Sequence, residues 1–401
     1  MGLVVQKYGG TSVKDAERVM NVARRVTDTY QKGNNVVVVV SAQGDTTDEL
    51  IEKAMEINPS PSKREMDMLL STGEQISISL LAMAIEKLGF PVVSMTGWQA
   101  GFRTDSTYGA ARIHEINADR IENELDKRRI VIVAGFQGIN KYDDIVTLGR
   151  GGSDTSAVAL AAVLGADVCE IYTDVDGVFT ADPRFVKTAY KLDEISYDEM
   201  LELASLGANV LHNRSVELAK KYNVKLAVKS SLNNNEGTYV KEVDQVEKMI
   251  VRGVTRDNDC ARIALCGVED TPGKAFQIFS LLSKNGIGVD LIIQSIGNGT
   301  QKDISFTTTE GDLDKALEVM DGNRSVLKVQ DIKWSKDVSK VSIVGAGMVN
   351  NVGVAAKMFE ALYNAHININ MIATSEIKIS VLVDQKDAER AVVAIHDKFL
   401  V

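Results

Sequence analysis

Two glycine-rich segments, far apart in the chain, combine residue types that bind anions. The first is Lys7 to Ser12 (KYGGTS), which follows an apolar run and feeds straight into a helical pattern. Backbone N–H groups at such a strand-to-helix turn can approach a phosphate closely, and Lys7 adds a point charge. A tight structural turn with a surface lysine is the alternative. The segment is not a Walker P-loop, because no Gly-Lys-Ser/Thr sequence follows it.

The second segment, Leu148 to Ser156 (LGRGGSDTS), precedes an apolar helical stretch. Its glycines suit a backbone that approaches a ligand, and the planar guanidinium of Arg150 suits a carboxylate. Asp154 could cap the following helix, or it could orient Lys7 and balance its charge. We favour the second interpretation, because a structural turn would not need Arg, three Gly, Ser and Asp together.

A third segment, Tyr172 to Arg184 (YTDVDGVFTADPR), is rich in carboxylates and hydroxyls. A calcium loop is excluded, because Phe185 stands where an EF-hand needs a bidentate Glu. The segment follows an apolar strand, so it suits a nucleotide at the carboxyl edge of an open sheet, with Arg184 reaching the phosphates. A polar loop without a ligand is the alternative, above all for Asp176.

Three other places give weaker signals. Ser41 to Asp48 follows a valine-rich strand and is expected at the same sheet edge as the first segment. Glu74 could be a first-turn helix residue, which is the usual meaning of Glu after such a sequence. Gly345 to Asn350 partly resembles a dinucleotide fingerprint, but its third glycine is missing and too few residues follow it.

The elements that position these segments alternate in the first part of the chain. Amphipathic helical patterns separate nearly continuous apolar runs, which is typical of a mostly parallel sheet covered by helices on both faces. In the first helical pattern, Ser12 and Asp15 are expected as the N-cap and its third-residue partner. The predicted strands are Leu3 to Val5, Val36 to Val40, Pro91 to Val93, Ile130 to Ala134 and Val168 to Tyr172.

The second part of the chain contains an internal repeat. A pattern running from Ile263 to Ile292 recurs from Val341 to Ile372, with a two-residue insertion before the second glycine. Each copy continues into another strand and another helical stretch, which gives a βαββα unit too small to be stable alone. We therefore expect two copies of one α+β module. The predicted divisions are a catalytic domain at 1–240, a joining linker or strand at 241–260, and modules at 261–337 and 338–401.

Composition restricts the function classes. The chain has 401 residues, 45% hydrophobic and 25% charged, with a net charge of −10, which argues against a bulk nucleic-acid partner. No apolar run approaches the length needed to cross a bilayer and the start of the sequence lacks a signal-peptide pattern, so a cytoplasmic protein without a membrane partner is expected. The three cysteines are too few and too irregularly spaced for a disulfide framework or a zinc site, and no metal-binding residues are predicted.

Taken together, these segments resemble the aspartate kinases of the amino-acid kinase superfamily over nearly the whole chain. The fold implied by the resemblance is α/β: an N-terminal mostly parallel αβα sandwich followed by two regulatory modules of the ACT type, with βαββαβ topology. The activity implied is transfer of the γ-phosphoryl group of ATP, with Mg²⁺, to the β-carboxylate of L-aspartate. This reaction gives 4-phospho-L-aspartate, the first step of lysine, threonine and methionine biosynthesis.

The resemblance also implies roles for residues. Lys7 and Asp154 would be catalytic. The ATP-binding residues would be Lys7, Gly9, Gly10, Ser41, Thr173, Asp174, Phe179, Asp182 and Arg184. Aspartate would be held by Thr47, Glu74, Arg150, Gly151, Gly152 and Ser153. Lysine, threonine or both would inhibit by binding to the paired modules at Asp270, Gly273, Ala275, Asp290, Gln294, Asn350, Asn351, Thr374 and Ser375.

The family pattern implies a homo-oligomer, a dimer or larger, formed through the ACT modules. Three positions depart from that pattern: Asn213 and Val352 replace expected prolines, and Gln43 occupies a position often filled by Met. The first departure is expected to loosen a loop near the nucleotide, and the second to alter effector preference. Two alternatives are another acceptor, such as glutamate, acetylglutamate or UMP, and a non-catalytic amino-acid sensor of the same fold.

Overall fold

The structure is a computed structural model of the chain, and it describes residues 2–208, 210–243, 249–295, 297 and 301–401. The chain forms two compact units. The first comprises Met1–Val178, Lys191–Ala204 and Asn209–Gln245, and the second comprises Phe179–Tyr190, Ser205–Ala208 and Val246–Val401. This division departs from the expected boundary after residue 240, because two short stretches before it group with the second unit.

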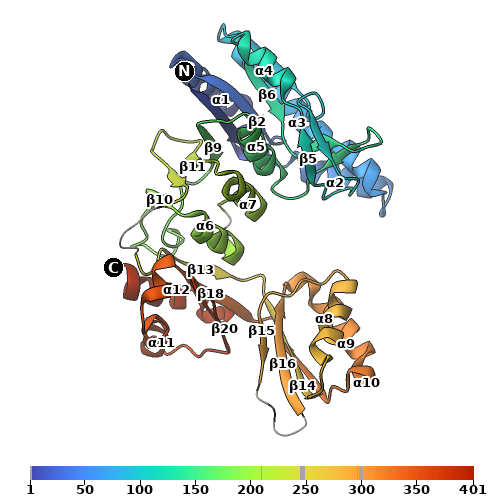
Figure 1. Cartoon of the computed structure of the whole chain (residues 1–401), viewed down its shortest axis with the longest axis vertical. Helices are drawn as coiled ribbons and strands as arrows, with labels where there is room; N and C mark the ends of the chain where they lie inside the picture. The colour runs from blue at the N-terminus through green and yellow to red at the C-terminus, as the bar shows by residue number, and fades with distance from the viewer. Residues whose placement is uncertain (1, 209, 244–248, 296, 298–300) are drawn as a thin grey trace. The chain divides into compact units, whose positions relative to one another are not determined.

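The main sheet of the first unit has eight strands in the order β10-β12-β11-β9-β1-β2-β6-β3 (Figure 1). All pairings from β11 through β3 are parallel, whereas β12 runs antiparallel to β11. The predicted, mostly parallel sheet is therefore confirmed. The strands are β1 (Leu3–Tyr8), β2 (Asn35–Val40), β3 (Val92–Met95), β6 (Ile130–Ala134), β9 (Val168–Thr173), β10 (Glu194–Ile195), β11 (Leu226–Ser230) and β12 (Thr238–Val240).

Helices cover both faces of this sheet. Alternate strand residues such as Val36, Val38 and Val40 pack in one core with α1 and α3, while α5 packs against β1, β2 and β9. The helices of the first unit are α1 (Ala16–Gln31), α2 (Thr46–Ile57), α3 (Lys63–Lys87), α4 (Asp119–Asp126), α5 (Gly152–Val163), α6 (Tyr197–Leu203) and α7 (Asn213–Tyr222). A smaller sheet has the strand order β5 (Ile113–Ile116), β4 (Phe102–Thr104), β7 (Gln137–Ile139) and β8 (Ile145–Thr147).

The start of α1 differs from the prediction. A three-residue 3-10 turn, Gly10–Ser12, follows β1, and α1 begins only at Ala16. Asp15 is itself the N-cap, and its side chain accepts a hydrogen bond from the Arg18 N–H at 2.9 Å. The expectation that Ser12 caps this helix is wrong, because the intervening turn places Ser12 too far from its first N–H groups.

The 25-residue helix α3 is, by length and composition, long and apolar enough to cross a bilayer, contrary to the sequence expectation. Its buried face packs Ile78, Leu81 and Ile85 into the core of the first unit. The same helix buries Asp67 and Glu74. These contacts are those of a helix that covers a sheet, and the core helices of globular proteins are often this long and this apolar.

The second unit contains the two predicted modules, each with a four-stranded antiparallel sheet. Module 1 has the order β15-β16-β14-β17 and module 2 the order β13-β18-β20-β19. The elements of module 1 are β14 (Ala261–Glu269), α8 (Lys274–Lys284), β15 (Ile292–Gln294), β16 (Gln301–Thr308), α9 (Leu313–Gly322), α10 (Arg324–Leu327) and β17 (Asp331–Ser335). Those of module 2 are β13 (Gly253–Asp257), β18 (Val338–Val344), α11 (Val354–Asn364), β19 (Met371–Thr374), β20 (Lys378–Asp384) and α12 (Ala388–Leu400).

The repeat seen in the sequence is confirmed by the matching helix starts. Gly273 and Gly353 are the N-caps of α8 and α11, with φ of +93° and +90°. The fourth strand distinguishes the modules. In module 1 it is β17, which follows the helices, whereas in module 2 it is β13, which precedes module 1 in the chain. The expected joining segment therefore contributes a strand to the second module.

The segment Phe179–Tyr190 also packs into module 2. Ala181 and Val186 lie in the same buried cluster as the strands and helices of that module. The hydroxyl of Thr180 lies 2.9 Å from Nε2 of the fully buried His396 on α12, and Thr188 lies 3.3 Å from Nδ1. A stretch expected in the catalytic domain is thus held by the core and the polar contacts of the second module.

Candidate functional site

An ion pair joins the two glycine-rich segments. Lys7, near the end of β1, places its Nζ 2.6 Å from Oδ1 of Asp154, which lies in the first turn of α5. Both side chains are nearly buried, at 12% and 13% exposure. Gly151, not Asp154, is the N-cap of α5, so the capping interpretation fails and the pairing with Lys7 is the one found. The two segments therefore meet at the carboxyl edge of the main sheet.

The loops after β1 and β2 lie in contact at the same edge. The Gly44 N–H donates to the carbonyl of Gly10 at 3.1 Å, and the Ser41 N–H donates to that of Tyr8 at 3.1 Å. A Cβ on Gly10 would lie 2.6 Å from the carbonyl oxygen of Ala42, so only glycine fits there. The segment after β1 reaches α1 through a 3-10 turn, and α5 begins at this edge at Gly152.

Arg150 lies in a turn of unusual backbone conformation. The glycines on either side of it, Gly149 and Gly151, have φ of +76° and +70°, which favours glycine. A Cβ on Gly151 would come within 2.2 Å of the ring of His212, so this position also excludes side chains. The Arg150 side chain is exposed, and no ion pair or hydrogen bond engages it within the described residues. Its guanidinium is available to an anion.

Ser153 connects this turn to the end of β6. A Cβ on Gly135, the residue after β6, would lie 2.7 Å from the Ser153 hydroxyl oxygen. The Gly135 N–H donates to the carbonyl of Val40 at the end of β2. Gly152 begins α5, and a Cβ there would lie 2.9 Å from the side chains of Leu148 and Phe136. The start of α5 is therefore pressed closely against the ends of the central strands.

Glu74 lies in the middle of α3, so the first-turn interpretation of this residue is wrong. Its side chain is 3% exposed, and Oε1 accepts a hydrogen bond from the Ala42 N–H at 3.0 Å. Oε2 is buried and has no hydrogen-bond partner among the described residues. Burial raises the pKa of Glu74 from 4.5 to about 7. An acceptor of this kind, beside the loop after β2, fits an incoming ammonium group.

The remaining predicted ligands divide between the units. Thr47 lies half-buried in the first turn of α2. Thr173 ends β9 and donates its hydroxyl to the Asp174 carboxylate at 3.1 Å. Phe179, Asp182 and Arg184 belong to the second unit. There Arg184 bonds the Asp182 carboxylate, with Nε–Oδ2 at 2.9 Å, and lowers the pKa of that carboxyl through this hydrogen bond. Asp176 accepts from Asn233 at 2.6 Å, as a structural loop residue would.

The predicted effector residues lie on exposed parts of the two modules. In module 1 they are Asp270, Gly273, Ala275, Asp290 and Gln294. In module 2, Asn351, Thr374 and Ser375 are exposed, while the side chain of Asn350 lies outside the described residues. Asp290 forms an ion pair with Lys340, a buried lysine of β18 that also lies 3.3 Å from Asp257. This pair links the two modules within the chain.

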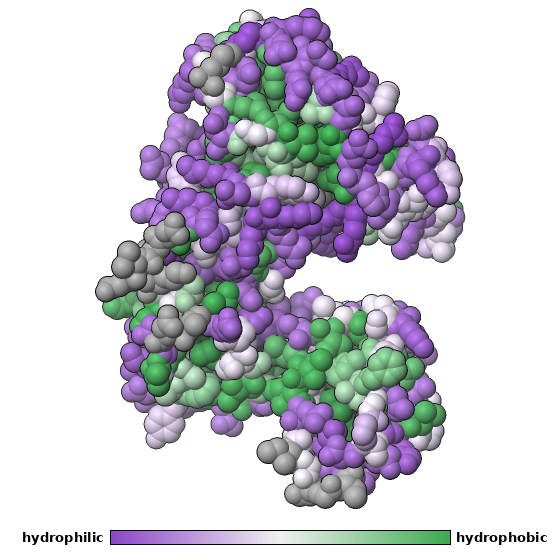
Figure 2. All heavy atoms as spheres, viewed as in Figure 1, coloured by the Kyte–Doolittle hydropathy of each residue, from purple (hydrophilic) through white to green (hydrophobic). Residues whose placement is uncertain are grey.

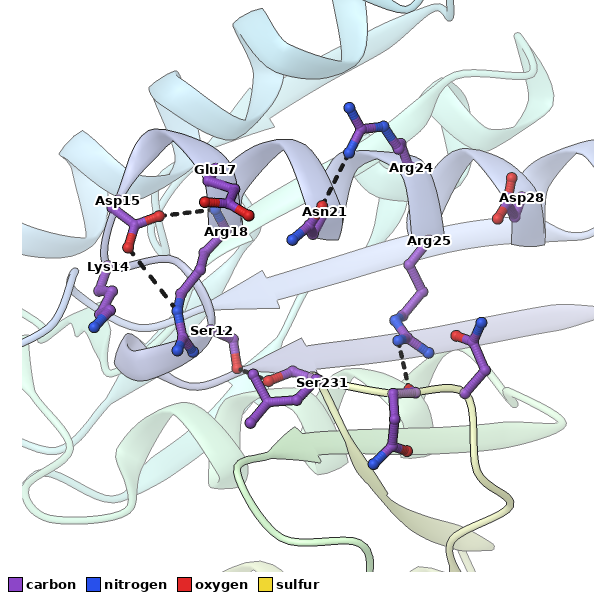
Figure 3. A pocket seen from close by; sticks show the side chains of 13 residues that line it. Ser12, Lys14, Asp15, Glu17, Arg18, Asn21, Arg24, Arg25, Asp28 and Ser231 are labelled. Atoms are coloured by element: carbon purple, nitrogen blue, oxygen red, sulfur yellow. Dashed lines mark hydrogen bonds and ion pairs between the residues drawn. The ribbon is translucent and has the colours of Figure 1, made fainter.

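A groove of about 640 Å³ follows the outer side of α1 (Figure 3). Four cationic side chains, Lys14, Arg18, Arg24 and Arg25, alternate along it with acidic ones. Ser12 hydrogen-bonds Ser231 at 2.8 Å on its floor, as Figure 3 shows. None of the predicted catalytic, ATP-binding or substrate residues line this groove, so it is separate from the sheet-edge site.

The three departures from the family pattern have local explanations. Asn213 is the first residue of α7, where proline is tolerated because its N–H is not needed. The N-cap is His212, whose side chain accepts a hydrogen bond from the Arg214 N–H. Gln43 donates to the carbonyl of Val13 at 2.5 Å and ties the loops after β1 and β2 together. Val352 is fully exposed before the glycine that caps α11.

Sequence reasoning missed two residues that hold the Arg150 turn. Arg214 donates to the carbonyls of Leu148 and Ala111, each at 2.9 Å. Asp67 accepts hydrogen bonds from Thr147, which immediately precedes the turn. Asp67 stands seven residues before Glu74 on α3, so a polar residue on the buried face of a helix was the available signal.

Comparisons with known proteins agree with this geometry. Residues 2–230 match the amino acid kinase family, and residues 263–322 and 341–399 match the ACT domain. An aspartokinase of Geobacillus stearothermophilus is 53% identical over 400 residues, covering 100% of this chain and 97% of that protein. Aspartokinase III of Escherichia coli, 25% identical with full coverage of both chains, is similar in two crystal structures. Its complex with aspartate and ADP gives a TM-score of 0.84, and its complex with lysine and aspartate gives 0.80.

The buried carboxylate of Glu74 predicts a pH-dependent stability. The folded state binds a proton there more readily than the unfolded chain, so ionisation destabilises the fold as pH rises from about 4.5 to about 7. Glu74→Gln keeps the acceptor for the Ala42 N–H and removes the charge. We expect it to raise the free energy of unfolding by about 2 kcal/mol at pH 8 and to have no such benefit at pH 4.

Denaturant unfolding at the two pH values measures this difference. Glu86→Gln, an exposed position on the same helix, is the control and should show no pH-dependent gain. A Glu74→Gln protein no more stable than the parent at pH 8 would contradict the electrostatic cost assigned to this carboxylate.

Proposed function

The chain belongs to the amino acid kinase family, as one of its aspartokinases with ACT domains, and from this we propose the reaction that it catalyses. We propose that it transfers the γ-phosphoryl group of ATP to the β-carboxylate of L-aspartate, giving 4-phospho-L-aspartate. The observation that carries the proposal is the Lys7–Asp154 ion pair, which lies at the sheet edge beside the Arg150 turn. The similar E. coli enzyme was crystallised with aspartate and ADP.

Aspartate recognition follows from two opposite charges at this edge. The free Oε2 of Glu74 would accept the substrate ammonium, and the exposed guanidinium of Arg150 would bind the α-carboxylate. Thr47, Ser153 and the backbone of Gly151 and Gly152 would complete the site. The β-carboxylate would then face the transferring phosphorus. Ammonium binding would also keep Glu74 ionised, since an adjacent cation lowers the pKa of a carboxyl group.

ATP would place its phosphates against Lys7, Gly9, Gly10 and Ser41. Thr173 and Asp174 of the first unit, with Phe179, Asp182 and Arg184, are proposed for the rest of the nucleotide on the strength of the family resemblance. Mg²⁺ would be held chiefly by the phosphate oxygens, because this ion is usually bound through substrate phosphates and few protein ligands. The ion would neutralise charge on the phosphates.

The reaction needs no general base, because the attacking β-carboxylate is already ionised at neutral pH. The protein must instead align two anions that repel each other. Lys7 provides positive charge, Asp154 fixes the direction of its ammonium, and the first N–H groups of α5 add their dipoles. Rate enhancement then comes from alignment and charge neutralisation.

Regulation by amino acids is proposed for the two ACT modules. Lysine, threonine or both would bind at the predicted effector residues and favour a less active arrangement of an oligomer. The E. coli relative was also crystallised with lysine. The enzyme would act in the cytoplasm, at the first step of lysine, threonine and methionine biosynthesis.

Exposed apolar side chains of the modules support assembly through them. Figure 2 shows hydrophobic residues reaching the surface over this part of the chain. Among the large apolar side chains that stand exposed in the modules are Phe276, Ile292, Trp334, Tyr363 and Ile372. Such surfaces commonly bind another chain, so a homodimer or larger oligomer is proposed.

Removal of the Lys7 charge tests the catalytic proposal. Lys7→Ala is expected to lower kcat by about 10²- to 10³-fold while leaving the fold intact, because Lys7 pairs only with Asp154 among the described residues. ADP release coupled to NADH oxidation, with circular dichroism for the fold, measures both. Lys14→Ala, an exposed lysine on the same segment, is the control. Near-normal turnover in Lys7→Ala would refute its role.

A substrate panel tests the acceptor. ADP release is expected with L-aspartate and not with glutamate, acetylglutamate or UMP. The charges of Glu74 and Arg150 match a free α-amino acid, which acetylglutamate and UMP are not, and the extra methylene of glutamate would displace its side-chain carboxylate from the transferring phosphorus. ADP release with UMP or acetylglutamate alone would favour another member of the family. No release with any acceptor would favour a non-catalytic amino-acid sensor.

The effector proposal is tested in the same assay with lysine, threonine and the two together. At least one addition is expected to reduce the rate at subsaturating aspartate, and light scattering with the same additions reports the oligomer. Unchanged rates in all three cases would count against regulation.

A further inference from the structure

Asp67 is a buried charge that the proposed mechanism leaves unused. Its side chain lies on α3 and is 1% exposed. Its carboxylate accepts three hydrogen bonds: Oδ2 from the N–H groups of Gly109 and Thr147 at 2.8 and 3.1 Å, and Oδ1 from the Thr147 hydroxyl at 2.6 Å. No Lys or Arg forms an ion pair with it within the described part of the chain. A polar group this deeply buried is costly unless it is hydrogen-bonded, and all three of its donors belong to Gly109 and Thr147, so packing alone is a poor explanation for it.

The three bonds fix the two segments that underlie the Arg150 turn. Thr147 is the last residue of β8 and the turn begins at the next residue. Gly109 lies against the turn itself, since a Cβ on Gly149 would come 3.0 Å from the Gly109 carbonyl oxygen. The Ala111 N–H donates to the Thr147 carbonyl at 2.9 Å and joins the segments again. Asp67 therefore sets where the turn starts and what it rests on.

The turn has little conformational preference of its own. Arg150 lies between two glycines with positive φ, and glycine restricts the backbone less than any other residue. The direction of the Arg150 side chain thus depends on how the flanking residues are held. On the side of α3 that support is Asp67, and on the side of α7 it is Arg214, which bonds the Leu148 carbonyl.

The same helix carries Glu74, seven residues and about two helical turns after Asp67. Glu74 is buried against the loop after β2, and Asp67 against the segment before Arg150. One rigid helix therefore controls both groups proposed to bind the two charges of an α-amino acid. The distance between the ammonium acceptor and the carboxylate donor follows from this shared support.

We propose that Asp67 is a positioning residue for the amino-acid substrate, acting through Arg150. This inference rests on the proposed function, because it assumes that Arg150 binds the α-carboxylate of aspartate. Asp67 does not touch substrate. Its contribution is to hold the turn so that the guanidinium faces the group it binds.

The test is a double-mutant cycle with aspartate and ATP kinetics measured separately. Asp67→Ala is expected to raise KM for aspartate about tenfold and to change KM for ATP less than twofold. In an Arg150→Ala background the same substitution should have almost no further effect on KM for aspartate, because the residue it acts through is gone. If the double variant raised KM for aspartate by the product of the two single effects, the inference would be overturned.

Asp67→Asn provides the conservative rescue. Its amide oxygen can accept both backbone N–H groups and its NH₂ can donate to the Thr147 hydroxyl, so KM for aspartate should stay within about threefold of the parent value. Ser71→Ala on the same helix is the matched control, because among the described residues that hydroxyl bonds only the Met68 carbonyl of α3. It should leave both KM values unchanged.

Two further measurements keep the outcomes distinct. If Asp67→Ala does not fold, as judged by circular dichroism, Thr147→Val replaces it in the cycle, because it removes the 2.6 Å bond alone. If the parent enzyme releases no ADP with aspartate, the proposed function fails and this inference fails with it. If the parent is active and Asp67→Ala changes both KM values equally, Asp67 is merely structural and only this inference fails.

Discussion

The site depends on one pairing of opposite charges across the carboxyl edge of a parallel sheet. Lys7 and Asp154 lie 2.6 Å apart and are largely shielded from solvent, so each charge offsets part of the cost of burying the other. Their separation in sequence means that the central strands must be in the correct order before the pair can form. The pair in turn brings the N-terminus of α5 to the residues that follow β1 and β2. The remaining ligands are arranged around this fixed point.

The surroundings of a buried carboxylate differ among three residues of this fold, Asp67, Asp154 and Glu74. Asp154 is neutralised by a lysine, Asp67 is stabilised by backbone and hydroxyl donors, and Glu74 keeps one oxygen without a partner among the described residues. Burial raises the pKa of Glu74. A group left incompletely satisfied in the folded protein is suited to receive a ligand, because the ligand supplies the missing interaction.

Much of the fold could be predicted from the sequence because its strands are covered on both faces. The valine run Val36 to Val40 predicts a strand buried on both faces, and the repeated glycines that cap α8 and α11 revealed two modules. The glycine-rich segments were also recognisable, because no structural turn needs such a composition. Their meeting at one edge follows from the parallel sheet, because the first segment follows β1 and the second begins α5, the helix that leads to β9, the parallel neighbour of β1.

Other features depend on contacts between distant segments, for which the local sequence gives a weak signal or none. Glu74 and Asp67 look like ordinary helix residues until the partners of α3 are known. The 3-10 turn before α1 moved the helix start, so Ser12 was mistaken for a cap. Phe179–Tyr190 was assigned to the catalytic domain, although its core partners belong to module 2. The strand β13 has only five residues, and nothing in them identifies a partner more than eighty residues further along.

That distant partner means that one module is nested within the sequence of the other. Module 2 needs β13 to complete its sheet, yet the whole of module 1 is synthesised between β13 and β18. During translation, module 1 can form its own sheet first, while β13 still lacks its partner strand β18. Module 2 closes last and involves the more distant contacts, which slow folding through the cost of closing a long loop. Strand β20 thus completes a sheet whose first strand in the sequence, β13, is synthesised much earlier.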